Sequence, residues 1–384
     1  MTLLRFIFSA IAIVAGTIFG VASAQETASG WRYTKESMRP FWSSDVITDE
    51  PILFVRDIQT GESRGTVLFP IDQVIAVRSS AGDVQYTQGV DYRFDRGSSE
   101  LVVPPGSRIV TVAASDLRRP ANSQKHRLTH RDGNGEIMFG AKLEYHQIQT
   151  HVTYRKSRSD WPLEMPRFDA ATLPKTLKKL RDGEALSIVL LGDSISTGCN
   201  ASSWGGGAPF QPAYQDLLVQ HLQSRYKSNV SLKNLAVGAT STPWGITMVE
   251  TVLENRPDLV ILAFGMNDSA GRTPKEYGDN IATIIERTRA SAPETEFILI
   301  ASMLGNRDWT LLKHDVFPQY RDKLAALCNQ GVALADMTSV WEEFLKRKKD
   351  ADLTGNGVNH PNDFGHRVYA QVLSARLIDH ASDQ

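Results

Sequence analysis

Residues 186–196 read LSIVLLGDSIS, an uninterrupted apolar run that ends in a short polar turn. Such a run is typical of a parallel strand that is buried on both faces. Comparable runs follow at 232–237, 259–264, 297–301 and 332–335. Helical patterns alternate with them at 211–226, 242–255, 275–292, 316–329 and 340–348, before a closing helix at 362–378. This alternation predicts an α/β domain with a parallel sheet and right-handed crossovers.

The region before this sheet has a different pattern. Short β-branched and aromatic runs are separated by turns rich in glycine, proline and aspartate, and they lie at 52–55, 65–69, 74–77, 109–112 and 147–154. Closely spaced short strands of this kind predict a β-sandwich. We therefore divide the chain into a signal peptide at 1–24, a β-rich domain at 25–156, a linker at 157–175 and the α/β domain at 176–384.

The first 24 residues have the pattern of an export signal. Arg5 precedes an apolar stretch at 6–21, and Ala22-Ser23-Ala24 forms a small-residue cleavage site. We expect cleavage after Ala24, a secreted or periplasmic protein, and no membrane span in the mature chain. Export would permit a disulfide between Cys199 and Cys328, although the sequence leaves open whether their sulfur atoms meet.

Composition excludes several classes of protein. The 384 residues are 41% hydrophobic and 22% charged with a net charge of -1, so the chain lacks the basic excess of a nucleic-acid-binding protein. Two cysteines exclude a disulfide-dense scaffold and a four-cysteine zinc site. The sequence contains neither a phosphate-binding nor a dinucleotide-binding glycine motif, and no His-Glu-x-x-His. We predict no metal and no cofactor.

Polar residues follow the predicted strands and suggest a catalytic site. Ser194, Gly238 and Asn267 each come directly after an apolar run, and His360 precedes the closing helix. The carboxyl ends of parallel strands meet at one edge of a sheet, where such domains place their sites. A serine hydroxyl becomes a nucleophile when a base takes its proton, and His360 can be that base. The amide of Asn267 and the backbone N–H groups of Gly238 and Ser194 can stabilise an oxyanion.

These residues resemble a known family. Gly192-Asp193-Ser194, Gly238, the GMND stretch at 265–268 and His360-Pro361 are similar, in this order, to the four sequence blocks of the SGNH (GDSL-type) hydrolases. The resemblance covers about half of the chain, roughly 186–377. It implies a flavodoxin-like three-layer α/β/α sandwich, Ser194 as nucleophile, His360 as base, and an oxyanion hole formed by Ser194, Gly238 and Asn267. The two-domain arrangement is also similar to bacterial carbohydrate esterases that remove acetyl groups from polysaccharides such as xylan.

The sequence departs from the family at one position. The family usually has an aspartate three residues before the histidine, where it orients the imidazole, and this chain has Gly357 there. Asp352, Asn356 or a backbone carbonyl could orient the ring instead. Some two-domain esterases of this type use a serine–histidine dyad oriented by a carbonyl. We hypothesise such a dyad here, so that an Asp352→Ala variant would keep most of its activity.

The sequence therefore predicts a serine esterase that hydrolyses an O-acyl ester, specifically an O-acetyl group on a carbohydrate or another small ester, through an acyl-enzyme on Ser194. Trp204, in the glycine-rich loop 203–208, is a candidate for stacking on a sugar ring and equally a candidate for packing. Three alternatives remain open: a lipid or thioester hydrolase, an O-acetyltransferase, and a non-catalytic glycan-binding protein.

Overall fold

The computed structural model describes residues 30–157, 161–165 and 167–380. The predicted signal peptide lies outside these residues. Among the described residues, no helix is long and apolar enough to cross a membrane.

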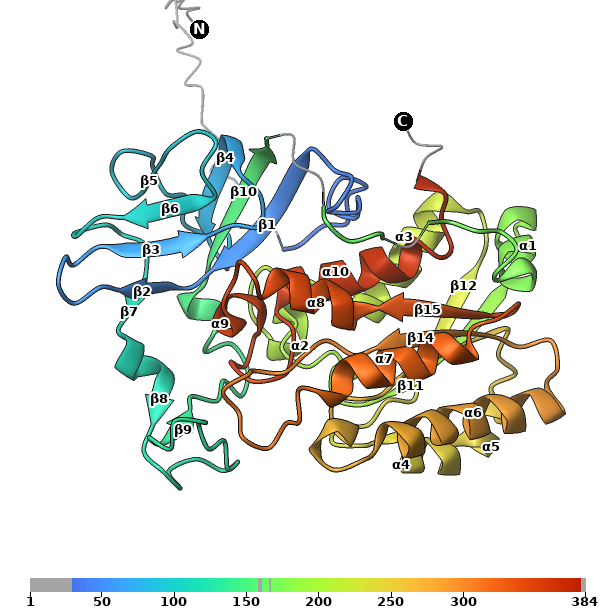
Figure 1. Ribbon diagram of the computed structural model, residues 1–384. Coiled ribbons are helices and arrows are strands. Elements are labelled where there is room, and N and C mark those ends of the chain that lie inside the picture. The colour runs from blue at the N-terminus through green and yellow to red at the C-terminus, as the bar shows by residue number, and fades with distance from the viewer. Residues whose placement is uncertain (1–29, 158–160, 166, 381–384) are drawn as a thin grey trace, which may run out of the picture.

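A five-stranded sheet forms the centre of the α/β domain (Figure 1). Its strands are β11 (Leu186–Gly192), β12 (Val230–Asn234), β13 (Leu259–Ala263), β14 (Glu296–Ala301) and β15 (Val332–Asp336). Their order is β12-β11-β13-β14-β15, and every pairing is parallel. This confirms the predicted parallel sheet. The chain reverses its direction of travel across the sheet next to β11, and a ligand site is expected at such a point.

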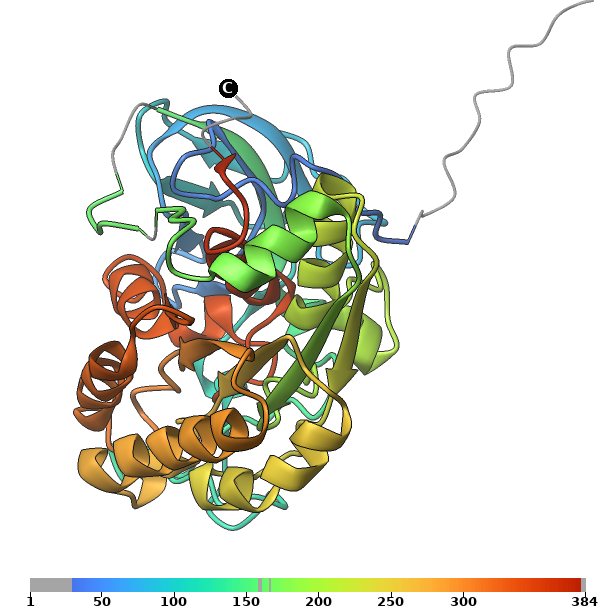
Figure 2. The same cartoon turned by 90° about the vertical axis from the view of Figure 1, so that its right-hand side faces the viewer.

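Helices cover both faces of the sheet, as Figure 2 shows from a second direction. Alternate strand residues explain this arrangement, because Val189 and Leu191 belong to one apolar cluster and Ile188 and Leu190 to the other. The first cluster includes residues of α5 (Val249–Glu254), α6 (Pro274–Ser291) and α7 (Val316–Leu327), with α4 (Thr242–Thr247) beside α6. The second includes residues of α1 (Pro174–Asp182), α3 (Tyr214–Arg225), α8 (Met337–Phe344) and α10 (Asp363–Ser374). The α/β domain is therefore a three-layer sandwich.

Several predicted boundaries were inaccurate. The helix predicted at 242–255 is two helices, α4 and α5, which meet at Met248. The Thr247 hydroxyl donates to the carbonyl of Trp244, and the Met248 N–H donates to the carbonyl of Gly245 instead, so the regular helical pattern ends there. Helix α1 begins at Pro174, inside the predicted linker. Of the strand predicted at 109–112, only β7 (Thr111–Val112) is extended and paired.

The N-terminal domain contains two main sheets. One is antiparallel and has the order β1 (Val46–Ile52), β10 (Thr150–Lys156) and β4 (Ile71–Ser79). The other has the order β5 (Arg93–Phe94), β6 (Glu100–Val103), β3 (Ser63–Thr66), β2 (Phe54–Arg56) and β7. Ile52, Val77 and Tyr154 from the first sheet share a buried core with Phe54 and Leu101 from the second. This is the predicted β-rich domain ahead of the α/β domain.

A long excursion of the N-terminal domain, residues 113–145, reaches the α/β domain; we call it the extension. It holds the small hairpin of β8 (Arg118–Arg119) and β9 (Glu136–Ile137), which Figure 1 shows apart from the two main sheets. The N–H of Thr310 donates to the carbonyl of Thr129 at 3.1 Å, and the N–H of Arg131 donates to the carbonyl of Asp308 at 2.7 Å. The extension is therefore hydrogen-bonded to a loop of the other domain.

A buried ion pair also joins the two domains. The Lys348 ammonium lies 2.7 Å from Glu50 Oε1, and both side chains are fully buried. Glu50 accepts further bonds from the Leu68 N–H and the Tyr154 hydroxyl, both at 2.8 Å. Burial raises the pKa of Glu50, and the Lys348 charge opposes this shift. The negative charge of Glu50 in the N-terminal domain is thus stabilised by Lys348 of the α/β domain.

Candidate active site

Ser194 lies in the turn that follows β11. Gly192 passes so close to β13 that an added Cβ would lie 2.7 Å from the Ala263 carbonyl oxygen. Asp193 closes the turn, because its carboxylate accepts the Ile195 N–H at 3.0 Å and its carbonyl accepts the Ser196 N–H at 3.1 Å. Burial raises the pKa of Asp193 to about 7. The turn leaves Ser194 partly exposed at the carboxyl end of the strand.

His360 lies at the end of a loop that Asn356 organises. The Asn356 side-chain oxygen accepts the N–H groups of Val358, Asn359 and His360 at 2.9, 2.9 and 3.1 Å. The N–H of Gly355 donates to the carbonyl of His360 at 3.0 Å and closes the loop. Because these bonds fix the backbone, the imidazole has a defined position before α10 begins.

The structure brings Ser194 and His360 together. His360 Nε2 lies 2.9 Å from Ser194 Oγ, and Nδ1 lies 2.8 Å from the side-chain oxygen of Asn200. An amide oxygen only accepts, so Nδ1 carries the proton and Nε2 is free to accept the serine proton. Burial lowers the pKa of His360 to about 3, with a smaller effect from His366, and therefore favours the neutral ring.

The sequence analysis missed Asn200, which orients the imidazole in the structure. Neither Asp352 nor Asn356 contacts the ring: Asp352 accepts the N–H groups of Leu53 and Lys349, and Asn356 holds the backbone loop. No backbone carbonyl takes this place either, so the acceptor, Asn200, differs from all three candidates that the sequence offered. Asn200 follows Ser194 by six residues and has a left-handed backbone with φ of 64°. Asparagine is enriched in that conformation, so an asparagine shortly after the nucleophile was the one sequence feature that could have pointed to this position.

The predicted oxyanion donors lie near Ser194. A Cβ added to Gly238 would lie 3.7 Å from Ser194 Cβ, which places the glycine directly beside the serine. Asn267 donates one amide N–H to the Thr240 carbonyl at 2.8 Å, and this bond fixes the amide while leaving its second N–H available. Within the described residues, the backbone N–H groups of Ser194 and Gly238 make no hydrogen bond. Three donors can therefore serve a developing oxyanion.

The remaining candidates from the sequence are Trp204 and the two cysteines. Trp204, in the four-residue helix α2 (Ser202–Gly205), is 43% exposed, and the adjacent Gly205 packs against Leu143 of the extension. Both Cys199 and Cys328 are free thiols. In the described part of the chain, no group of three His, Cys, Asp or Glu side chains could hold a metal ion.

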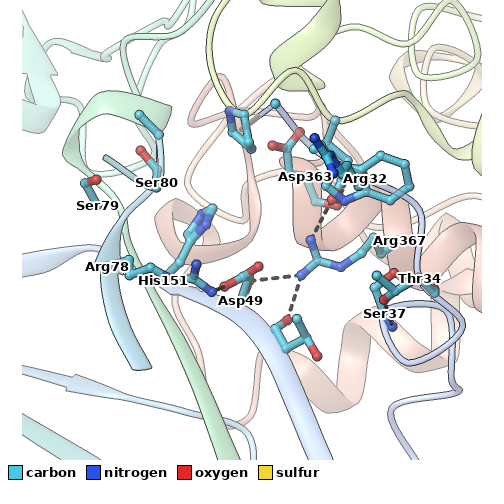
Figure 3. A pocket seen from close by; sticks show the side chains of 17 residues that line it. Arg32, Thr34, Ser37, Asp49, Arg78, Ser79, Ser80, His151, Asp363 and Arg367 are labelled. Carbon is cyan, nitrogen blue, oxygen red and sulfur yellow. Dashed lines mark hydrogen bonds and ion pairs between the residues drawn. The ribbon is translucent and has the colours of Figure 1, made fainter. Parts of the chain in front are cut away.

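A separate cavity of about 390 Å³ lies between the domains and is lined by neither Ser194 nor His360 (Figure 3). The buried Arg367 of α10 donates to the carbonyls of Thr48 and Asp49 on β1 at 2.7 and 3.0 Å. Arg78 lies 3.4 Å from the Asp49 carboxylate. The two carbonyls lie in the irregularity of β1 between Ile47 and Glu50, where the regular pairing with β10 is interrupted. Arg367 thus joins α10 of the α/β domain to β1 of the N-terminal domain.

Comparison with known proteins gave one family and several similar folds. Residues 190–368 match the GDSL-like Lipase/Acylhydrolase family. A search of curated protein sequences gave no match. Among solved structures, a two-domain esterase active on acetylated mannans is 20% identical over 54% of this chain and 53% of its own, with a TM-score of 0.44. The matched region thus spans about half the length of that esterase.

Two further solved structures match a similar part of this chain, and the match covers nearly all of their own length. An acetyl xylan esterase is 18% identical over 50% of this chain and 100% of its own, with a TM-score of 0.40. An acetyl xylan esterase from Geobacillus stearothermophilus is 18% identical over 51% of this chain and 96% of its own, with a TM-score of 0.42.

Proposed function

We propose, from the match of residues 190–368 to the GDSL-like Lipase/Acylhydrolase family, that the protein is a serine esterase with Ser194 as nucleophile and His360 as general base. One observation carries the proposal: His360 Nε2 accepts from Ser194 Oγ at 2.9 Å while Nδ1–H is held by Asn200. This geometry has the nucleophile, the base and the orienting group in one line of hydrogen bonds.

The reaction would proceed in two halves. His360 Nε2 takes the hydroxyl proton of Ser194 as Oγ attacks the ester carbonyl, and the resulting oxyanion accepts from the Ser194 and Gly238 N–H groups and the Asn267 amide. His360 then gives the proton to the departing alcohol oxygen, which leaves an acyl group on Ser194. Water repeats the sequence: it loses a proton to His360, attacks the acyl carbon and releases the carboxylic acid, and the proton returns to Ser194 Oγ.

We further propose that the substrate is an O-acetyl ester on a carbohydrate and that the enzyme acts after export. The exposed indole of Trp204 supports a sugar substrate, because an aromatic face can pack against the apolar face of a sugar ring. The export signal predicted at 1–24 supports a substrate outside the cytoplasm. Neither observation depends on the catalytic residues, so the substrate can be tested separately from the chemistry.

The test measures acid release by the purified protein and by a Ser194→Ala variant. The substrates are 4-nitrophenyl acetate, a longer-chain 4-nitrophenyl ester and a panel of acetylated polysaccharides. We expect the wild type to release acetate, with the polymer favoured, and Ser194→Ala to lose at least about 10³-fold in kcat/KM. Ser123→Ala, an exposed serine of the extension, serves as the matched control and should retain full activity.

Other outcomes would each change the proposal. Activity retained in Ser194→Ala would refute the serine nucleophile. Preference for the longer-chain ester would replace the carbohydrate substrate with a lipid or thioester. Transfer of acetate to a sugar hydroxyl in place of water would make the protein an O-acetyltransferase. Glycan binding by a folded protein that turns over no ester would make it a binding protein.

A further inference from the structure

The position of the missing family aspartate is occupied by the N-terminal domain. Gly357 has φ of 77°, and a Cβ added there would collide with the ring of Tyr145 at the end of the extension. Gly140 also packs closely there, since its added Cβ would lie 2.9 Å from Tyr145 Cδ2 and 3.3 Å from the Gly355 carbonyl oxygen. A side chain at 357 therefore has no room to reach His360, because the extension fills that space.

The same segment determines which way the Asn200 amide points. Asn200 Nδ2 lies 2.9 Å from the Lys142 carbonyl oxygen, 3.3 Å from that of Gly140 and 3.2 Å from that of Gly355. Carbonyl oxygens only accept, so this cluster requires the NH₂ end of the amide. The amide oxygen must then face His360 Nδ1. Asn200 is 4% exposed, so water cannot substitute for these partners on both sides.

We propose that segment 138–145 of the N-terminal domain is a positioning element of the active site, and that its Gly140 and Lys142 carbonyls, through the amide of Asn200, set the proton of His360 on Nδ1. The inference rests on the proposed function for its kinetic tests. Tyr145 secures the segment, because its hydroxyl donates to the Met138 carbonyl at 3.0 Å and its ring packs with Leu53 and Val112. Gly140 is bonded directly to the catalytic loop, since its N–H donates to the Asn356 carbonyl at 3.0 Å.

The sharpest test is Asn200→Asp, which would install the carboxylate that the family usually has. In an ordinary triad this change should preserve or raise activity. Here the second carboxylate oxygen would face three carbonyl oxygens, which repel it unless it carries a proton. We expect kcat/KM for 4-nitrophenyl acetate to fall at least about tenfold below wild type at pH 8 and to recover at pH 5, where the carboxyl group is protonated. The exposed Asn134→Asp in the extension is the matched control and should show no such profile.

A second test perturbs the segment from the N-terminal domain alone. Tyr145→Ala should lower kcat about tenfold with little change in KM, because the imidazole is less well oriented while substrate contacts remain. Tyr145→Phe keeps the ring and should restore most of kcat. Tyr92→Ala removes an equally buried tyrosine elsewhere in the N-terminal domain, so it should reduce stability without lowering kcat. Circular dichroism and thermal unfolding would verify that each variant is folded at the assay temperature.

An NMR readout separates this inference from the proposed function. In protein labelled with ¹⁵N-histidine, His360 is assigned with a His360→Gln variant, and we expect a neutral ring protonated on Nδ1. In Asn200→Ala the ring should become a mixture of tautomers. The inference is wrong if Asn200→Asp equals wild type at pH 8, if Tyr145→Ala keeps the wild-type kcat, or if the ring is protonated on Nε2. Loss of the proposed function would appear instead as an inactive wild type with the Nδ1 tautomer intact.

Discussion

Replacing Lys348 by methionine should destabilise the protein far more at pH 7 than at pH 5. The substitution keeps an apolar side chain of similar length and removes the ammonium that lies 2.7 Å from Glu50. Glu50 would then be fully buried without a counter-charge. Its least costly state is then the protonated one, because burial raises the pKa of the carboxyl group above the ordinary 4.5 and no ammonium opposes that shift.

The expected magnitude follows from that protonation. A carboxyl group that ionises at 4.5 in the unfolded chain and stays neutral in the folded protein costs up to about 3.4 kcal/mol at pH 7, at about 1.36 kcal/mol per pH unit. The cost at pH 5 is about 0.7 kcal/mol by the same relation. The lost hydrogen bond from Lys348 to the Thr66 carbonyl adds about 1 kcal/mol at either pH. Because the raised pKa of Glu50 in the wild type already carries part of this cost, the free energy of unfolding should fall by at most about 4 kcal/mol at pH 7 and at most about 2 kcal/mol at pH 5.

Urea unfolding, followed by circular dichroism and tryptophan fluorescence at both pH values, measures these differences relative to wild type. Lys178→Met removes the exposed partner of Asp182 and should leave the free energy of unfolding almost unchanged at either pH. A double variant, Glu50→Gln with Lys348→Met, should lose this pH dependence, because no group that titrates between pH 5 and pH 7 remains at the site. Equal losses for Lys348→Met at pH 5 and pH 7 would refute the reasoning.

Three further predictions concern the active site. The low pKa of His360 keeps the ring neutral, so kcat/KM for 4-nitrophenyl acetate should stay level as the pH falls from 7 to 5, and an inflection near 6.5 in the pH–rate profile would contradict this. Burial raises the pKa of Asp193 to about 7, so the wild type should lose stability relative to Asp193→Asn as the pH rises from 4 to 7. Thermal unfolding of both proteins across that range measures this. A difference in Tm between them that does not change with pH would show that the folded protein accommodates the carboxylate instead. Trp204→Ala should raise KM for an acetylated polysaccharide several-fold and leave KM for 4-nitrophenyl acetate unchanged, and equal effects on both substrates would exclude a sugar-stacking role.

The sequence was sufficient to predict the sheet and the residues at its edge. The apolar runs at 186–191 and 259–264 are long enough to identify buried parallel strands, and the geometry of a parallel sheet brings the residues that follow them to one edge. Ser194, Gly238 and Asn267 lie there for this reason. His360 also lies there, because it directly precedes the helix that returns to the sheet. These placements depend on local pattern and on sheet topology, which a sequence records well.

The contacts of Asn200 could not be predicted in the same way. Its role depends on a left-handed backbone conformation, on the glycine at 355 that allows close approach, and on two carbonyls from a segment about 60 residues earlier. Backbone carbonyls have no sequence signature, because every residue supplies one. Asp352 drew attention since it is a carboxylate near His360 in sequence. In the structure it binds the Leu53 N–H across the domain interface instead.

The close packing of Tyr145 on Gly357 has a consequence for how such a protein can change over generations. An aspartate at 357 would need the tyrosine to withdraw, and a withdrawn tyrosine would release the carbonyls that hold Asn200. A single substitution to aspartate at 357 is therefore not expected to create an ordinary triad. On the proposed role of segment 138–145, exchanging the first domain for an unrelated one would remove the Gly140 and Lys142 carbonyls that hold Asn200, even with every residue after 176 unchanged.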